Sequence, residues 1–162
     1  MRFSLVDRIT ELSVGKHITA TKVLTLAEEY LADHFPRFPV MPGVMMLEAM
    51  YQASAWLIRK SEDFEHSIVV LREARNVKLS NFVEPGQVLV MQATIMRQTD
   101  ETTMLKAEAT VEGKTAVTAR LVLERYNLAD RYPSRAATDD FTRRELRDAF
   151  NILYHPATAE DS

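Results

Sequence analysis

The sequence contains no cysteine and no long apolar run. Without cysteine, disulfides, thiolate catalysis and cysteine-ligated zinc are excluded. No segment approaches the roughly 20 uncharged apolar residues that a membrane-spanning helix requires. The first twelve residues also lack the basic-then-apolar pattern of a secretory signal. We therefore expect a cytoplasmic protein with no membrane span.

The sequence also lacks the patterns that bind metals or nucleic acids. Its four histidines, His17, His34, His66 and His155, are scattered, with no HExxH or comparable ligand spacing. The net charge of -3 gives no sign of a surface that neutralises many phosphates. We expect neither a metal site nor a nucleic-acid partner.

What is present is typical of a globular protein. Hydrophobic residues make up 46% and charged residues 27% of the 162 positions, enough for one substantial hydrophobic core. We expect one main domain over residues 1–126, followed by a linker and a short helix over residues 127–162.

One long helix is predicted for residues 43–60, which contain strong helix formers and no internal proline or glycine. Glu48 and Gln52 are the strongly polar side chains between Val44 and Ile58, so nearly the whole circumference requires burial. Met45, Met46, Met50 and Trp56 are expected to fill the core, and Tyr51 fits either core or site.

Strands are predicted on both sides of this helix. Residues 16–25 alternate apolar and polar side chains, as the first strand would. After Ser67 come SIVVL, a short run at 76–79, and three longer runs at 88–98, 102–111 and 115–126. Short polar connections separate the last three, which is typical of hairpins. An antiparallel sheet wrapped round a central helix, an α+β fold, accounts for this order.

The C-terminal residues follow a different pattern. Residues 127–140 show no apolar period and are predicted to be a linker. The next segment places apolar side chains on one helical face, with N-cap candidates at Thr138 to Asp140. The face comprises Leu146, Ala149, Phe150 and Leu153.

The segment from His34 to Gly43 carries prolines at positions 36, 39 and 42. Each fixes its own φ and favours an extended residue before it, so we predict a stiff polyproline-II rod that positions His34. The rod leads into a helix N-terminus with free N–H groups, suited to an anion or a carbonyl. The alternative is a plain connection in which His34 is an ordinary loop histidine.

Glu48 is the second candidate for chemistry. A buried carboxylate without a partner costs several kcal/mol, which a raised pKa or a hydrogen bond usually relieves. A carboxyl that stays protonated at neutral pH suits a general acid, and Gln52, four residues on, could orient it. A structural partner such as an arginine is the alternative.

Taken together, DHFPRFPVMPGVMMLEAMYQA resembles the signature GHFPxxPxMPGVLxxEAxAQ of FabZ-type 3-hydroxyacyl-acyl-carrier-protein dehydratases. The stretches FSLVDRITEL and NVKLSNFVEPGQVL are also similar, so the resemblance spans approximately residues 3–123. It implies a hot-dog fold in which an antiparallel sheet wraps a long central helix. It also implies a homodimer with shared active sites, commonly within a hexamer built as a trimer of dimers.

The resemblance further implies the residue roles. His34 would remove the C2 proton, Glu48 would donate a proton to the departing 3-hydroxyl, and the Gly43 N–H would polarise the thioester carbonyl. No metal or redox cofactor is required. Candidate substrate-binding residues in and beside the motif are Gly43, Val44, Gln52, Tyr51 and Phe35.

The partner implied is acyl carrier protein, for which a basic rim is expected. Candidates for it are Arg59, Lys60, Arg72, Arg75 and Lys78, with a solvated face as the alternative. Asp33 stands where the family usually has glycine, and the tail after Tyr126 has no counterpart. Two other functions stay open: a hot-dog thioesterase, and a catalytically weakened subunit that binds acyl chains.

Overall fold

The structure of the chain, a computed structural model, describes residues 3–156. Its largest element is one six-stranded sheet, ordered β1-β2-β4-β5-β6-β3, with every neighbouring pair antiparallel. The predicted meander is confirmed, because β4, β5 and β6 are neighbours in this order. The strands are β1 (Arg8–Ser13), β2 (His17–Val23), β3 (Ile68–Leu79), β4 (Val88–Gln98), β5 (Thr102–Val111) and β6 (Lys114–Tyr126).

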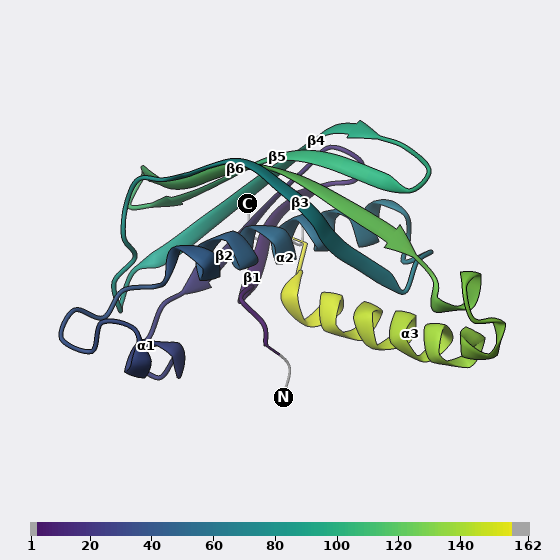
Figure 1. Cartoon of the computed structure of the whole chain (residues 1–162), viewed down its shortest axis with the longest axis horizontal. Coiled ribbons are helices and arrows are strands. Elements are labelled where there is room, and N and C mark those ends of the chain that lie inside the picture. The colour runs from purple at the N-terminus through teal and green to yellow at the C-terminus, as the bar shows by residue number, and fades with distance from the viewer. Residues whose placement is uncertain (1–2, 157–162) are drawn as a thin grey trace.

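One long helix, α2 (Gly43–Ser61), lies under the curved sheet (Figure 1). The helix predicted for residues 43–60 is confirmed to within one residue. Ala49, Ala53 and Leu57 recur every four positions, lie on one side of the helix and have no exposed surface. This side packs into the main core of the protein, which also includes buried residues of β2, β4, β5 and β6.

The N-terminal region contains a strand that the sequence did not reveal. We predicted residues 16–25 as the first strand, and β2 lies there, but β1 precedes it. Only Ile9 is buried in β1, because this strand lies at the edge of the sheet and has a register shift next to that residue. With one buried side chain, the alternation that identifies a strand is too weak to recognise. A one-turn helix, α1 (Tyr30–Asp33), was also missed.

Strand β3 forms the other edge of the sheet. The two short runs predicted at 67–71 and 76–79 are one continuous strand with two register shifts, which break the alternation between them. The strand pairs with β6 on one side, and within residues 3–156 no strand pairs with its other side. Val77 and Leu79 are 41% and 59% exposed on it.

The C-terminal segment comprises two short 3-10 turns, η1 (Leu128–Asp130) and η2 (Pro133–Arg135), and helix α3 (Ala136–Leu153). Helix α3 begins earlier than predicted, since residues 136–140 of the expected linker form its first turn and a half. The expected apolar face is present. Phe150 is buried and its ring centroid lies 6.1 Å from that of Trp56 and 5.8 Å from that of Phe64.

The predicted N-cap of this helix is wrong, because Asp139 lies inside the helix and its side chain is buried. Its carboxylate accepts hydrogen bonds from the N–H groups of Leu128 and Ala129, at 3.0 and 2.9 Å, and from the Ser67 hydroxyl. A charged residue in a polar stretch looked exposed in the sequence. Its real partners are the backbone of η1 and a residue 72 positions away.

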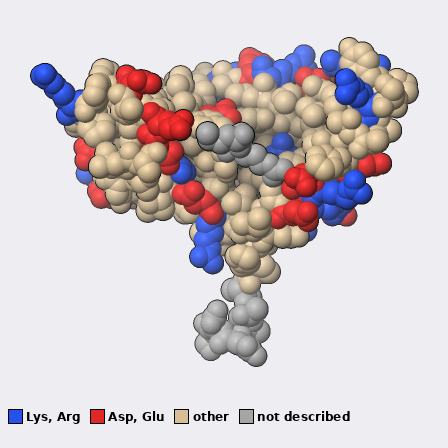
Figure 2. Space-filling view, turned by 90° about the horizontal axis from the view of Figure 1, so that it is seen from below, with Lys and Arg blue, Asp and Glu red and all other residues tan. Residues whose placement is uncertain are grey.

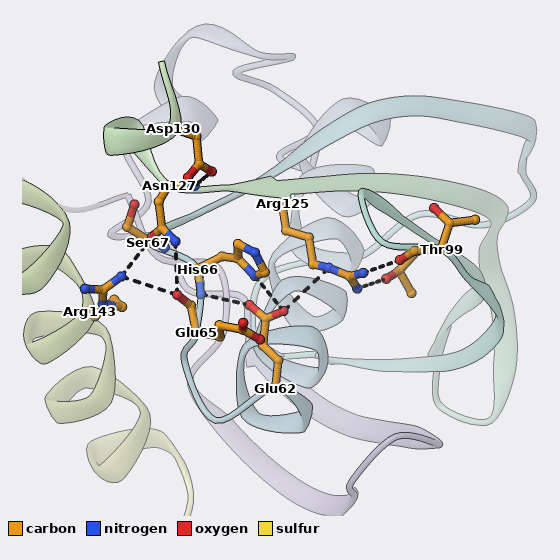
Figure 3. A network of polar contacts seen from close by, with 10 residues as sticks. Glu62, Glu65, His66, Ser67, Thr99, Arg125, Asn127, Asp130 and Arg143 are labelled. Carbon is orange, nitrogen blue, oxygen red and sulfur yellow. Dashed lines mark hydrogen bonds and ion pairs between the residues drawn. The ribbon is translucent and has the colours of Figure 1, made fainter. Parts of the chain in front are cut away.

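Further contacts hold α3 against the body of the protein. Asn127 accepts hydrogen bonds from the Ser67 N–H and from the Arg143 guanidinium, each at 2.9 Å (Figure 3). Arg147 donates to the carboxylate of Asp63 at 3.0 Å. The helix is therefore fixed at its polar side as well as its apolar face. Among the described residues, no helix is long and apolar enough to cross a membrane.

Candidate active site

Glu48 lies on the side of α2 that faces away from the core strands, and it is half-buried. The Gln52 amide donates a hydrogen bond to Glu48 Oε1 at 3.1 Å. Gln52 is itself fixed by the N-terminal segment, since it accepts from the Leu5 N–H at 2.7 Å and donates to the Phe3 carbonyl at 3.1 Å. The structure thus brings Glu48 and Gln52 together and holds the carboxyl in one orientation.

A cavity of about 570 Å³ opens beside Glu48. One wall is the outer face of α2, with Gln52, Trp56 and Arg59, and the opposite wall is α3. Most residues of that wall are apolar, such as Leu146 and Ile152, and Thr142 and Glu145 are its polar members. The volume lies within the range of small-molecule sites, and an apolar enclosure with a few polar groups is their usual composition.

Tyr51 lines the same cavity with its ring, but its hydroxyl donates to the Val69 carbonyl at 2.8 Å. Burial raises the pKa of the Tyr51 phenol above its ordinary value, and Arg59 opposes this shift. The phenol therefore stays protonated and bonded to β3. It contributes a surface to the cavity and no proton-transfer group.

The loop that carries His34 differs from the predicted rod. Phe35 has φ of +49°, and the Phe38 N–H donates to the Phe35 carbonyl at 2.8 Å, so residues 35–38 form a tight turn. The rod prediction is therefore wrong at Phe35, where the chain reverses although proline follows. His34 is half-buried directly after α1 and packs on the Phe35 ring, with centroids 4.4 Å apart.

The N-terminus of α2 has the free donors that were expected. Pro42 is the N-cap and makes no side-chain cap, and the first turn contains no acidic residue. Gly43 is half-buried and Val44 is 73% exposed. A Cβ at position 43 would lie 2.6 Å from a methyl group of Leu79, so a larger residue here would require that side chain to move.

The two catalytic candidates are not brought together within one chain. Among the described residues, the cavity that Glu48 lines does not include His34, Phe35, Gly43 or Val44. His34 and Phe35 lie in the loop after α1, and Gly43 and Val44 begin α2. Two exposed aromatic rings also lie outside that cavity, those of Phe38 and Phe82, whose centroids are 6.1 Å apart.

The structure places Arg59 at the cavity. We predicted it in a basic rim, but its side chain lines the cavity and its Nε is buried. The spacing of Glu48, Gln52 and Arg59 at intervals of four and seven was the signal that could have shown this, because it places all three on one helical face. Seen from the side of α3, acidic and basic side chains are interspersed and much of the surface is uncharged (Figure 2).

One cluster could in principle hold a cation. Ligand atoms of Glu62, Glu65 and His66 lie within 4.8 Å of one another. Glu62 already accepts from His66 Nδ1 at 3.0 Å and pairs with Arg125 Nε at 3.5 Å (Figure 3). Through these contacts Glu62 and His66 connect the C-terminal end of α2 to Arg125 of β6.

Comparisons with known proteins identify the family. The model of the FabA-like domain matches residues 1–120. A 3-hydroxyacyl-[acyl-carrier-protein] dehydratase FabZ from Lactobacillus helveticus is 39% identical over 116 residues, which cover 72% of this chain and 78% of that protein. The FabZ of Lactococcus lactis subsp. cremoris is 38% identical, with coverage of 74% and 82%.

Solved structures agree on the fold. A chain of the dehydratase heterocomplex ApeI:P from Xenorhabdus doucetiae is 22% identical, with a TM-score of 0.64 and coverage of 77% of this chain and 84% of that chain. The smu.793 protein of Streptococcus mutans, bound to acetyl CoA, is 12% identical, with a TM-score of 0.61 and coverage of 78% and 94%. The hot-dog fold predicted from the sequence is confirmed.

Proposed function

The chain belongs to the FabA-like family, and from this premise we propose that it dehydrates (3R)-3-hydroxyacyl-acyl-carrier-protein to the trans-2-enoyl thioester in fatty-acid or specialised acyl-chain biosynthesis. The observation that carries the proposal is the Glu48 carboxyl. It is oriented by Gln52 at the wall of an apolar cavity, where an acyl chain would place its 3-hydroxyl beside a proton donor.

In the proposed reaction, His34 takes a proton from C2 of the substrate, and the electron pair of that C–H bond forms the C2–C3 double bond. The C3–O bond breaks, and Glu48 gives its proton to the leaving oxygen, so that water departs. A neutral imidazole has a free ring nitrogen that can accept the proton. No cofactor is needed, because protons alone are transferred.

The start of α2 would stabilise the charge that develops on the thioester oxygen. Its first-turn N–H groups, of which that of Gly43 is the first, face no acidic side chain in that turn. Prepositioned backbone donors stabilise an enolate oxygen without reorganisation. We assign carbonyl binding to Gly43 and Val44, orientation of Glu48 to Gln52, and contact with the substrate to Tyr51 and Phe35.

We further propose that the active enzyme is a homodimer in which His34 of one subunit meets Glu48 of the other. The edge of β3 is long and unpaired in a single chain, and such edges pair with a second chain or require protection. Exposed apolar side chains surround it. They include Val44, Val77, Leu79 and Phe82, which are 41% exposed or more.

The remaining assignments extend this proposal. A trimer of such dimers would be the hexamer, acyl carrier protein would deliver the substrate, and the cytoplasm would be the compartment. We assign the dehydratase domain to residues 1–126, followed by a linker and an amphipathic C-terminal helix in residues 127–162.

The test is turnover of 3-hydroxyacyl thioesters, followed by ultraviolet absorbance of the conjugated product, for wild type, His34→Ala and Glu48→Gln. We expect each variant to lose at least about 10²-fold in kcat/KM, as is usual for an acid-base group. The exposed residues His155 and Glu84 supply matched controls, His155→Ala and Glu84→Gln, which should keep wild-type rates.

Other outcomes would identify another function. Release of free thiol that survives His34→Ala would indicate a thioesterase, which needs a carboxylate to activate water. Binding of acyl thioesters without any turnover would indicate an acyl-binding subunit. In that case Asp33→Gly, which restores the residue usual in the family, should recover turnover.

A further inference from the structure

The far end of the cavity beside Glu48 contains a second polar group, Arg59. The two residues are separated by 11 positions on the same face of α2, which corresponds to about 16 Å along the helix axis at 1.5 Å per residue. Between them the wall is formed by Gln52, Ala55 and Trp56. The cavity therefore has the Glu48 carboxyl at one end and the Arg59 guanidinium at the other, and Glu145 of α3 also lines it.

Arg59 is incompletely satisfied. Its Nε is buried and has no hydrogen-bond partner among the residues that the structure describes. The guanidinium carbon lies 5.1 Å from the centroid of the Trp56 ring, a cation–π contact that helps to position the group at the wall. Burial lowers the pKa of Arg59 from its usual value, against the opposing effect of Tyr51 and Glu62. A buried donor without a partner is costly and calls for an explanation such as a ligand.

The opposite wall comes from outside the matched family region. Helix α3 begins at Ala136, beyond the FabA-like match at residues 1–120, and it supplies Leu146, Ala149 and Ile152 to the cavity. Ile152 is 74% exposed although it is apolar. The helix is fixed by the buried Asp139 and by Arg147, so its apolar wall has a defined position.

We propose that the cavity between α2 and α3 holds the far end of the substrate's acyl chain, and that Arg59 donates a hydrogen bond to an oxygen carried at that end. The inference rests on the proposed function, because it takes Glu48 as the group beside C3. The cavity is continuous from Glu48 to Arg59, and its apolar walls suit the methylene groups between them. The substrate class would be acyl chains with a terminal hydroxyl, keto or carboxylate oxygen.

The dimensions give the chain length. An extended chain advances about 1.2 Å per bond, since three backbone bonds span up to about 3.6 Å. The distance of about 16 Å along α2 between Glu48 and Arg59 is shortened by the length of the Arg59 side chain. The remaining length has room for on the order of ten bonds beyond C3. Shorter substrates would occupy the Glu48 end alone.

The experiment compares four carrier-bound 3-hydroxyacyl thioesters: 3-hydroxybutanoyl, a plain alkyl chain with about ten bonds beyond C3, and its terminal hydroxyl and terminal carboxylate analogues. Wild type should prefer an oxygenated long chain over the plain one in kcat/KM. Arg59→Met should lower this preference roughly tenfold or more, as expected for a lost hydrogen bond from a charged donor. Which analogue is preferred identifies the oxygen, a neutral hydroxyl or a carboxylate.

The matched control is Arg144→Met, the same change at an exposed arginine of α3 that does not line the cavity; it should keep the wild-type preference. Equal turnover of plain and oxygenated chains by wild type would refute the inference while leaving the dehydratase function intact. Absence of turnover even with 3-hydroxybutanoyl would instead overturn the proposed function, and the inference with it.

If Arg59→Met does not fold, a second variant can still test the inference. Ile152→Trp places a large side chain at an exposed position of the cavity wall, where folding tolerates it. It should lower the ratio of long-chain to 3-hydroxybutanoyl turnover. A changed mass in solution with an unchanged ratio would show that this face binds a second copy of the chain, and would exclude the acyl chain as its occupant.

Discussion

The two faces of α2 differ in how completely they are packed. On the sheet side, Ala49, Ala53 and Leu57 are fully buried and touch apolar neighbours. On the other side, Glu48 and Arg59 are half-buried and border a cavity. The first face determines the fold, since apolar burial drives it. The second keeps polar groups and unfilled volume, which cost stability, and such local departures from good packing are typical of functional sites.

The largest effect on stability is expected on the sheet side. Leu57→Ala removes a fully buried side chain and leaves a cavity under the sheet, so the free energy of unfolding should fall by about 2–5 kcal/mol. Urea unfolding at fixed protein concentration measures the change, because association also contributes to apparent stability.

The matched control is Leu26→Ala, the same truncation at a residue that is 73% exposed, which should change the free energy of unfolding by less than about 0.5 kcal/mol. If the two variants were equally stable, the sheet-facing side of α2 would not be tightly packed. The difference in packing between the two faces of the helix would then be refuted.

A smaller loss of unfolding free energy is expected at the residues that attach α3 over the cavity face of α2. Asp139→Asn replaces a carboxylate that accepts hydrogen bonds from Ser67, Leu128 and Ala129, and should cost about 2 kcal/mol in unfolding free energy. The exposed neighbour supplies the control, since Asp140→Asn removes a surface pair with Arg143 worth at most about 1 kcal/mol.

The effect of Asp139 should depend on pH. Burial alone would raise its pKa, but the hydrogen bonds from Ser67, Ala129 and Leu128 outweigh burial and lower the pKa below the usual 3.8. The carboxylate therefore stabilises the fold fully above pH 3.8, and this contribution is lost as the pH falls through the lower folded-state pKa. The stability difference between wild type and Asp139→Asn should shrink in acid; a difference that grew there would contradict the assignment.

The contrast between the faces also explains what the sequence could reveal. The sheet side of α2 and strands β4 to β6 follow regular apolar periods, so residues 43–60 and the meander were predictable. Asp139 was misplaced because its hydrogen-bond partners come from other segments of the chain. No local pattern indicates that Ser67 would bind Asp139, or that α3 would lie opposite Arg59.

The candidate site shows the same division. The spacing of Glu48 and Gln52 gave their common face correctly, because four residues make about one helical turn. The turn at Phe35 was not predictable from its prolines, since a residue before proline favours extended backbone and the positive φ is imposed by the surrounding chain. The contact between His34 and Glu48 cannot be derived from the pattern of one chain, because in the proposed dimer a second subunit supplies the Glu48 that meets His34.

The smallest effect is expected at Tyr51, where the two faces meet. Tyr51→Phe keeps the ring that lines the cavity and removes the hydroxyl that donates to the Val69 carbonyl, so unfolding free energy should fall by about 1 kcal/mol. Tyr132→Phe, at a ring that is 63% exposed, is the control and should be neutral. Urea unfolding distinguishes the pair. If the unfolding free energy of Tyr51→Phe fell by well above ~2 kcal/mol, the surroundings of Tyr51 would be as tightly packed as those of Leu57. The cavity face of α2 would then not differ in packing from the sheet face.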